Sequence, residues 1–319
     1  EDNYRIGVDV PTDQVFINGS ATPDTLALVE YIDRTSNSFN PVMAPQRKTA
    51  PWSQKYGFSY GDQFRLFDRP LGVIATLSYN NKYSARTVTD GNYEMGSPES
   101  PRLGENSLLT GPQGAHEVLW GGLANLKYTI HNNHKLGAKY IHNQSGINEA
   151  LYRSGENYNV NNDTANFDYR RRELTYVERS LSSVQLDGEH FGFFGSGLRL
   201  NWQASYSKTN QDEPDYRNFN DQIGIELVED PISGDLVPGD TIVFIDKGAM
   251  LEPNRRWSTL DEENRTFDAD LLIPVFERTD LKTGFSYLKK ERDRTDREFR
   301  YGNTANYQEY GNIDEYIRD

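Results

Sequence analysis

The sequence predicts an all-β fold, an antiparallel transmembrane β-barrel segment with long extracellular loops. Apolar residues fall on every second position over long stretches, which is the period of a strand with one apolar face. Only 35% of the residues are hydrophobic, whereas 12% are aromatic, and this balance suits one thin apolar layer better than a soluble core. Short turns also alternate with long polar connections, which is typical of outer-membrane barrels.

The clearest predicted hairpin surrounds the turn at residues 131–134, with the sequence HNNH. Its apolar face carries Val118, Trp120, Gly122, Ala124, Leu126, Tyr128 and Ile130 before the turn, and Leu136, Ala138 and Tyr140 after it. The opposite face carries Asn125, Lys127, Thr129 and Lys139. These runs are longer than the roughly 5–6 residues of most strands in soluble proteins. A strand that separates an apolar from a polar environment over this length fits a barrel wall.

Three further hairpins repeat the alternation, around turns near residues 62–70, 192–197 and 274–280. The segments between hairpins are rich in Asn, Asp, Gly, Glu and Pro, and we expect long loops at 84–116, 144–173, 209–256 and 292–319. In lipid every backbone polar group must be paired within the protein, so a sheet spans a membrane only as a closed barrel. We therefore expect residues 55–319 to form a partial β-barrel of about eight strands.

The first 54 residues differ from the rest. Thr22 and Pro23 suit the N-cap and the first position of a helix, so a short helix is expected after them. We interpret residues 1–54 as a strand remnant plus a loop that leads into the barrel and carries this helix.

The composition excludes several classes of function. There are no cysteines, which excludes disulfides and thiolate metal sites. The formal net charge of -14 argues against nucleic-acid binding, and no apolar run is long enough for a transmembrane helix. The sequence shows no Ser-His-Asp set, nucleotide-binding loop or zinc-ligand spacing. We expect no enzymatic activity, no catalytic residues, no metal centre and no cofactor, and the ligand-binding residues stay unassigned.

Three tryptophans, Trp52, Trp120 and Trp257, stand at or just before the start of strands that lead from a long loop to a short turn. Indole has an apolar body and a polar N–H group, so an aromatic belt at the membrane interface is expected there. Chance placement is the alternative, because the chain has only four tryptophans.

Two charged clusters are candidate binding sites. Asp212, Glu213 and Asp215 offer the oxygen ligands that a hard cation such as Ca²⁺ requires, but a solvated loop turned by Pro214 is the favoured explanation. The arginine-rich stretch at 169–179 suits lipopolysaccharide phosphates or an anionic substrate. Its alternative is ion pairing with acidic residues on neighbouring strands.

Several segments, taken in order, resemble the barrel region of TonB-dependent outer-membrane receptors, particularly the large, loop-rich kind of Bacteroidetes. They are GDQFRLFDRPLGVIATLSY at 61–79, WGGLANLKYTIHNNHKLGAKYIHNQSGINEALYRSG at 120–155, YVERSLSSVQLDGEHF at 176–191, LRLNWQASYSKTNQDEPDYRNF at 198–219 and LKTGFSYLKKERDR at 281–294. No single segment is a sharp motif, and the resemblance lies in their order and spacing over most of residues 40–300.

The resemblance implies a barrel of about 22 strands in the bacterial outer membrane, closed by an N-terminal plug. It implies energy-coupled uptake of a nutrient such as a glycan, a peptide or a metal chelate. The implied partners are outer-membrane lipid and lipopolysaccharide, TonB through a missing N-terminal part, and a surface lipoprotein. Because the sequence shows no plug and no TonB box, we interpret the chain as a fragment of a longer receptor.

Two other readings stay open. A soluble all-β carbohydrate-binding or glycan-degrading protein would pack two apolar faces against each other and have turns of mixed length. A passive porin-like outer-membrane protein would share the barrel wall but have no plug.

Overall fold

The computed structural model describes residues 16–17, 20–21, 40, 42–95, 103–157, 167–192, 197–245, 253–276 and 278–300. All regular secondary structure in these ranges is β. Within the same ranges, no helix has the length and apolar character needed to cross a membrane. The short helix expected after Pro23 lies outside the described residues.

Nine antiparallel strands form one sheet, which confirms the predicted all-β antiparallel fold. They are β3 (Gln54–Leu66), β4 (Arg69–Met95), β5 (Leu103–His131), β6 (His134–Asn157), β7 (Phe167–Phe191), β8 (Arg199–Glu229), β9 (Leu236–Ile245), β10 (Asn254–Phe276) and β11 (Thr279–Arg300). A separate pair joins β1 (Phe16–Ile17) to β2 (Ser20–Ala21).

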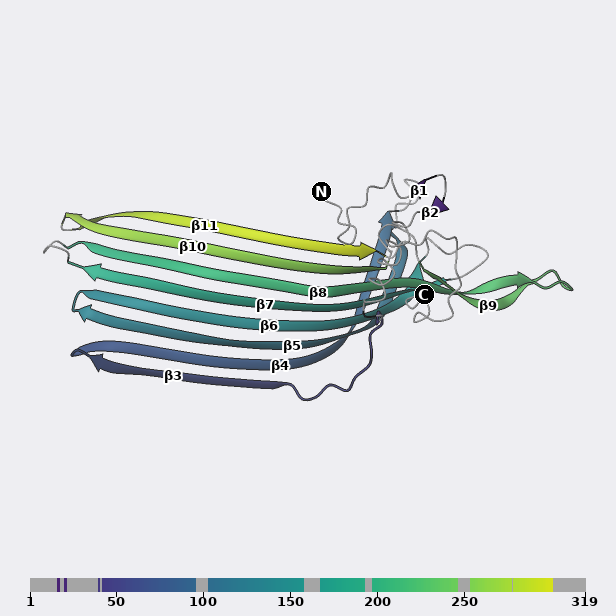
Figure 1. Ribbon diagram of the computed structural model, residues 1–319, viewed down its shortest axis with the longest axis horizontal. Coiled ribbons are helices and arrows are strands. Elements are labelled where there is room, and N and C mark those ends of the chain that lie inside the picture. Colours follow the sequence, from purple (N-terminus) through teal and green to yellow (C-terminus); the bar gives the residue numbers. More distant parts are fainter. Residues whose placement is uncertain are drawn as a thin grey trace.

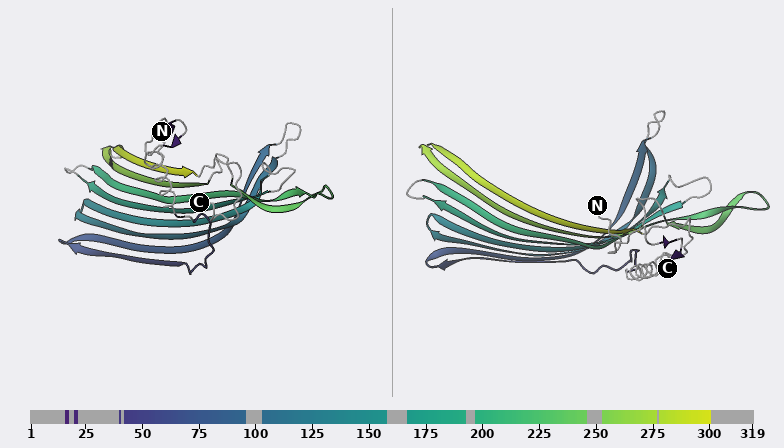
Figure 2. Two further views of the ribbon diagram at one scale, coloured as in Figure 1. Left: turned by 45° about the vertical axis from the view of Figure 1, so that its right-hand side comes forward. Right: turned by 45° about the horizontal axis from the view of Figure 1, so that its top comes forward.

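The strands form a meander in the order β11-β10-β8-β7-β6-β5-β4-β3, in which neighbouring strands follow each other along the chain, except that β10 pairs with β8 and β9 branches off β8. Figure 1 shows them side by side, with the short turns together at the left end. The two views of Figure 2 show one curved layer. Within the described residues β3 and β11 are the two edges of this sheet and do not pair with each other, so no closed barrel is found.

The short turns at one end agree with the prediction. The β3–β4 turn is tighter than expected, because pairing continues to Leu66 and Arg69 and leaves only Phe67 and Asp68 between the strands. Both turn residues have positive φ, 51° and 58°. Positive φ at both central residues is what a two-residue turn needs to match the twist of its strands. Asp tolerates this conformation, whereas Phe adopts it rarely.

The long loops expected at the other end are wrong over most of their length. Residues 84–95, 103–116, 144–157, 167–173 and 209–229 all lie in strands. Strand β5 has 29 residues and β8 has 31. These segments carry polar side chains on both faces, so hydrophobic periodicity does not reveal them. They are strands because equally long neighbours pair with their backbone groups.

Strand β8 changes partner along its length. Residues 199–218 pair with β10, whereas residues 221–229 pair with β9. Residues 221–224 still pair with β7 on their other side. Beyond them, within the described residues, β8 and β9 pair only with each other, and Figure 1 shows this ribbon projecting at the right end.

Among the described residues, the large buried side chains lie in the half of the sheet that is far from the short turns. The apolar ones are Met43, Leu109, Leu151, Tyr169 and Phe219. Buried polar residues accompany them, among them Arg172, Asn220, Asp221 and Arg255. Within the described residues, the half of the sheet near the short turns has no such core. Its large apolar side chains lie on the surface instead.

Candidate membrane-facing surface

One face of the sheet near the short turns is apolar across eight strands. Residues directly opposite each other in a ladder share a face, so the pairing register follows this face from strand to strand. One hydrogen-bonded row, read from β4 to β11, consists of Val73, Leu126, Ala138, Leu186, Ala204, Phe267 and Tyr287. We call this surface the apolar band.

The side of the apolar band that faces away from the short turns ends in aromatic residues. On seven of the eight strands an aromatic residue stands at this side of the apolar row, namely Tyr56, Tyr79, Trp120, Tyr140, Tyr206, Phe267 or Tyr287. On β5 Val118 follows Trp120 on the same face, and separate aromatic residues such as Tyr83 and Trp257 lie further out. Strand β7 is the exception and carries Val184. We call this series the aromatic boundary.

The aromatic boundary runs obliquely across the strands. On β3, β4 and β5 it lies in the row of Trp120, on β6 to β8 in the row of Ala124, and on β10 and β11 in the row of Leu126. Over the seven steps between neighbouring strands from β3 to β11, the boundary thus shifts by six residues along the strand direction, from the row of Trp120 to the row of Leu126. With about 3.3 Å per residue and about 4.8 Å between strands, the strands are inclined by roughly 30° to the normal of the boundary. Strands of outer-membrane barrels tilt by roughly 35–45°.

The apolar band is exposed and has the length of a membrane crossing. Leu126 is 43% exposed, Leu186 47% and Phe285 61%. On β4 the band runs from Leu71 to Tyr79, close to the roughly 9–11 residues of a tilted membrane-spanning strand. Within the described residues no second layer covers these side chains, as a soluble sandwich would require.

Of the three tryptophans predicted to form an interfacial belt, one lies at the aromatic boundary and two lie beyond it. Trp120 belongs to the aromatic boundary and is 43% exposed. Trp52 precedes β3, four residues beyond Tyr56, and is 90% exposed. Trp257 lies ten residues beyond Phe267 on β10 and makes an edge contact with Phe299, with 5.3 Å between ring centroids. The aromatic boundary consists mostly of tyrosines. These tyrosines belong to the alternating apolar rows of the sequence, but a search limited to tryptophan does not find them.

The fourth tryptophan, Trp202, packs over a glycine within the apolar band. Gly188 lies directly opposite Trp202, and a Cβ atom on Gly188 would come within 2.2 Å of the Trp202 indole nitrogen. That nitrogen donates a hydrogen bond to Nε2 of His190 at 3.0 Å. Gly188 is therefore required to be small because the indole occupies the space of its missing side chain.

The opposite face of the same strands is polar and carries paired charges. Lys127 donates to Glu189 at 2.6 Å, and Lys282 lies 3.3 Å from Asp270. Hydroxyl groups also form hydrogen bonds between strands, as between Ser205 of β8 and Thr266 of β10 at 2.6 Å. This face suits contact with water.

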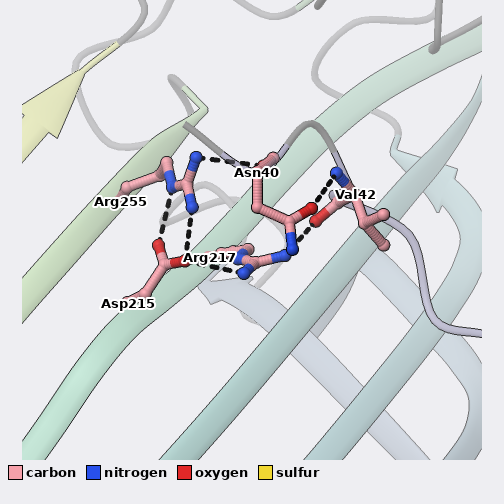
Figure 3. A network of polar contacts seen from close by, with 5 residues as sticks. All are labelled: Asn40, Val42, Asp215, Arg217 and Arg255. Atoms are coloured by element: carbon pink, nitrogen blue, oxygen red, sulfur yellow. Dashed lines mark hydrogen bonds and ion pairs between the residues drawn. The ribbon is translucent and has the colours of Figure 1, made fainter. Parts of the chain in front are cut away.

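Beyond the aromatic boundary, a carboxylate joins two arginines that hold an N-terminal segment. Asp215 accepts hydrogen bonds from Nε of Arg255 at 2.6 Å and from Nε of Arg217 at 2.9 Å. Arg255 also donates to the backbone carbonyl of Asn40 at 3.1 Å, and Arg217 donates to that of Val42 at 2.5 Å. Figure 3 shows the five residues together. We call Asn40 with residues 42–53 the anchored segment.

The candidate cation site at Asp212, Glu213 and Asp215 does not form. Glu213 is bonded by Arg256 at 3.0 Å, and both oxygens of Asp215 are taken by arginines. Burial raises the pKa of Asp215, but the hydrogen bonds from Arg255 and Arg217 outweigh it and lower the pKa below its ordinary value. In the described part of the chain, no group of three acidic or histidine side chains is arranged to hold a metal ion.

The arginine-rich stretch follows the ion-pairing alternative. Arg170 and Arg172 both bond Asp221, at 2.5 and 2.8 Å, and Arg171 pairs with Glu173. Arg153 of β6 joins Asp90 at 2.8 Å. These arginines stabilise the far end of the sheet and are not directed at a phosphate.

Comparisons of the chain with protein-family models, with curated proteins and with solved structures found no match.

Proposed function

We propose that this chain forms part of the transmembrane wall of an outer-membrane β-barrel, in a TonB-dependent receptor that imports a nutrient such as a glycan, a peptide or a metal chelate. The observation that carries the proposal is the exposed apolar band with its oblique aromatic boundary. Tilted strands in a bilayer give this pattern, because the lipid surface is flat while the strands cross it at an angle.

The energetics favour lipid contact over water. Burying one large apolar side chain contributes about 1.5–3 kcal/mol, and the band exposes many of them, among them Phe58, Leu77, Leu186 and Phe285. Soluble monomers rarely expose a contiguous apolar patch larger than a few hundred Å². Contact with lipid hydrocarbon removes the free-energy cost of exposing these side chains to water on all eight strands.

The two free edges support a wall that continues. In lipid, unpaired N–H and C=O groups cost several kcal/mol each, so the edges of β3 and β11, which have no partner strand within the described residues, need further strands. A barrel of about 22 strands, as the resemblance implies, pairs both edges. The polar face then lines the interior, where ion pairs such as Lys127–Glu189 contact water.

The receptor part of the proposal is supported by what lies beyond the aromatic boundary. Strands β5 and β8, with 29 and 31 residues, are far longer than a bilayer crossing requires. Their outer halves are stiffened by buried ion pairs such as Arg172–Asp221. Long ordered hairpins outside the membrane suit ligand capture, with a surface lipoprotein as a partner. Energy coupling through TonB is inferred from the resemblance.

The test uses the complete gene product in outer-membrane vesicles and exploits the absence of cysteine from this chain. Neighbouring residues on opposite faces give matched pairs, Leu126→Cys with Lys127→Cys and Leu186→Cys with Gln185→Cys. A fluorophore on residues 126 and 186 is expected to be quenched by brominated lipid chains. A fluorophore on residues 127 and 185 is expected to be quenched by aqueous iodide instead.

Equal quenching of both members of each pair would refute the membrane-facing band and favour the soluble reading. Uptake of the nutrient distinguishes the receptor from a porin. An uncoupler that collapses the proton gradient stops energy-coupled import, whereas diffusion through a porin continues.

A further inference from the structure

The residues just outside the aromatic boundary differ along the sheet. On each strand we consider the residue two positions beyond the boundary, which lies on the same face. Those on β3 to β7 are uncharged, namely Gln54, Asn81, Val118, His142 and Ser182. On β8, β10 and β11 this residue is Lys208, Arg265 and Lys289, so it is basic on all three strands. The positive charge is thus confined to one part of the boundary.

The three cations form one cluster. Arg265 lies directly opposite Lys289 on β11 and directly opposite Tyr206 on β8, and its guanidinium carbon is 5.9 Å from the centre of the Tyr206 ring. Lys208 lies two residues beyond Tyr206 on β8 and on the same face. With about 4.8 Å between strands and about 3.3 Å per residue, the backbones that carry the three cations lie within roughly 12 Å of each other.

The acidic residues nearby leave this cluster available. Arg265 lies 3.3 Å from Glu263 and Lys289 lies 2.6 Å from Glu291. The side chains of Arg265 and Lys289 are 54% and 47% exposed, and exposed ion pairs of this kind contribute little. Both glutamates lie one row further from the apolar band than Arg265 and Lys289, in the row of Lys208, and Glu263 lies directly opposite Lys208. Lys208 is exposed, and among the described residues it makes no ion pair within 4.0 Å.

Like charges directly opposite each other in a ladder destabilise a sheet, and the Arg265–Lys289 pair is such a case. Glu263 and Glu291, one row further out on the same face, offset part of this repulsion, and an anion bound at the level of Arg265 and Lys289 offsets the rest. In a bilayer, the level just outside an aromatic boundary is that of the lipid headgroups. Basic residues at this level attract anionic lipid, and Arg forks suit phosphate.

We propose that Lys208, Arg265 and Lys289 bind the phosphate groups of a phosphorylated lipid in the leaflet that surrounds the barrel, with the aromatic boundary residues contacting its upper acyl region. The site rests on the proposed membrane-spanning function and adds to it a specific lipid position on one side of the wall.

The test measures binding of lipid A to the complete gene product in detergent micelles by native mass spectrometry. One variant combines K208Q, R265Q and K289Q. The matched control combines K139Q, K282Q and K290Q, which removes the same charge from the opposite face of the same sheet. We expect the first variant to bind diphosphorylated lipid A at least about tenfold more weakly than the wild type. The control variant and the binding of dephosphorylated lipid A are expected to be unaffected by the substitutions.

Several results would overturn the site. Equal binding of diphosphorylated lipid A by wild type and the first variant shows that the cluster is not the binding site. An equal loss in the control variant shows a general charge effect. Competition by inorganic phosphate at the same concentration as lipid A shows an adventitious ion only. If the fluorophores at residues 126 and 186 still respond to brominated lipid, such results remove the lipid site and leave the proposed function standing.

Discussion

Replacement of Asp215 by Asn is expected to release the anchored segment. Asn accepts the positive φ of 65° at this position, so the backbone is preserved while the charge is lost. The side chain of Arg255 is only 2% exposed, and it then keeps a neutral partner in place of a carboxylate. A charge-assisted hydrogen bond contributes about 1.5–3 kcal/mol. We take about 2 kcal/mol as the loss, which is a roughly 30-fold rise in the open population of the segment.

Two methionines of the chain provide the assay. Met43, in the anchored segment, is 3% exposed, whereas Met95 is 81% exposed. Hydrogen peroxide therefore oxidises Met95 directly and Met43 only after the segment opens. In the Asp215→Asn variant, Met43 is expected to be oxidised about 30 times faster, with the rate at Met95 unchanged. Peptide mass spectrometry of the same sample measures both rates.

Asp212→Asn is the matched control, because Asp212 is exposed and belongs to the same acidic stretch. Its effect on Met43 should be negligible. The reasoning would be refuted by an Asp215→Asn variant in which Met43 reacts no faster than in wild type or in this control. Added Ca²⁺ should change none of the rates, whereas a cation site at the three carboxylates predicts protection.

The pH dependence follows from the direction of the pKa shift. The pKa of Asp215 is lowered from the ordinary 3.8, so its contribution to holding the segment is complete above 3.8 and is lost as the pH falls through the lower folded value. Oxidation of Met43 in wild type should accelerate in this acidic window. The Asp215→Asn variant should show no such acceleration.

Further variants test other parts of the structure. Asp221→Asn removes the carboxylate, 3% exposed, from Arg172, and a loss of about 3 kcal/mol is expected as a lower midpoint of thermal unfolding. An unchanged midpoint would contradict a stabilising role for this ion pair. Gly188→Val displaces the indole of Trp202, with a cost of about 1–3 kcal/mol, and the tryptophan emission should shift. Hydrogen bonds from Lys290, Asn264 and Arg292 lower the pKa of Glu262 to about 2. Carboxyl NMR should show this group still ionised at a pH where solvent-exposed acids are protonated.

The sequence predicts the part of the fold in which the two faces meet different surroundings. Around Leu126 and Lys127 the side chains alternate strictly, and the strands and short turns were placed correctly from this pattern. Along the outer half of β8 both faces are polar, so no period is visible and the sequence predicts a loop there. The backbone ladder, which makes it a strand, leaves no trace in the side chains.

The candidate sites show the same limit. Asp215 and Arg255 lie 40 positions apart, so the stretch DEPD alone looks like a cation site while its real partners come from the adjacent strand. The aromatic boundary was missed for a related reason. Its obliqueness is a property of the register between strands, and Tyr140 and Tyr287 are recognised as members of one series only when the pairing is known.

The change of partner in β8 has a practical consequence. The β8–β9 ribbon projects from the sheet, and Ile232 at its tip is 95% exposed. The tip residues bond only to one another, as in the contact from Ile232 N–H to Asp230 at 2.7 Å. Exposed tips of this kind accept inserted sequence well. An epitope tag placed after Ile232 would therefore be displayed far from the curved sheet, without breaking a ladder bond of any neighbouring strand.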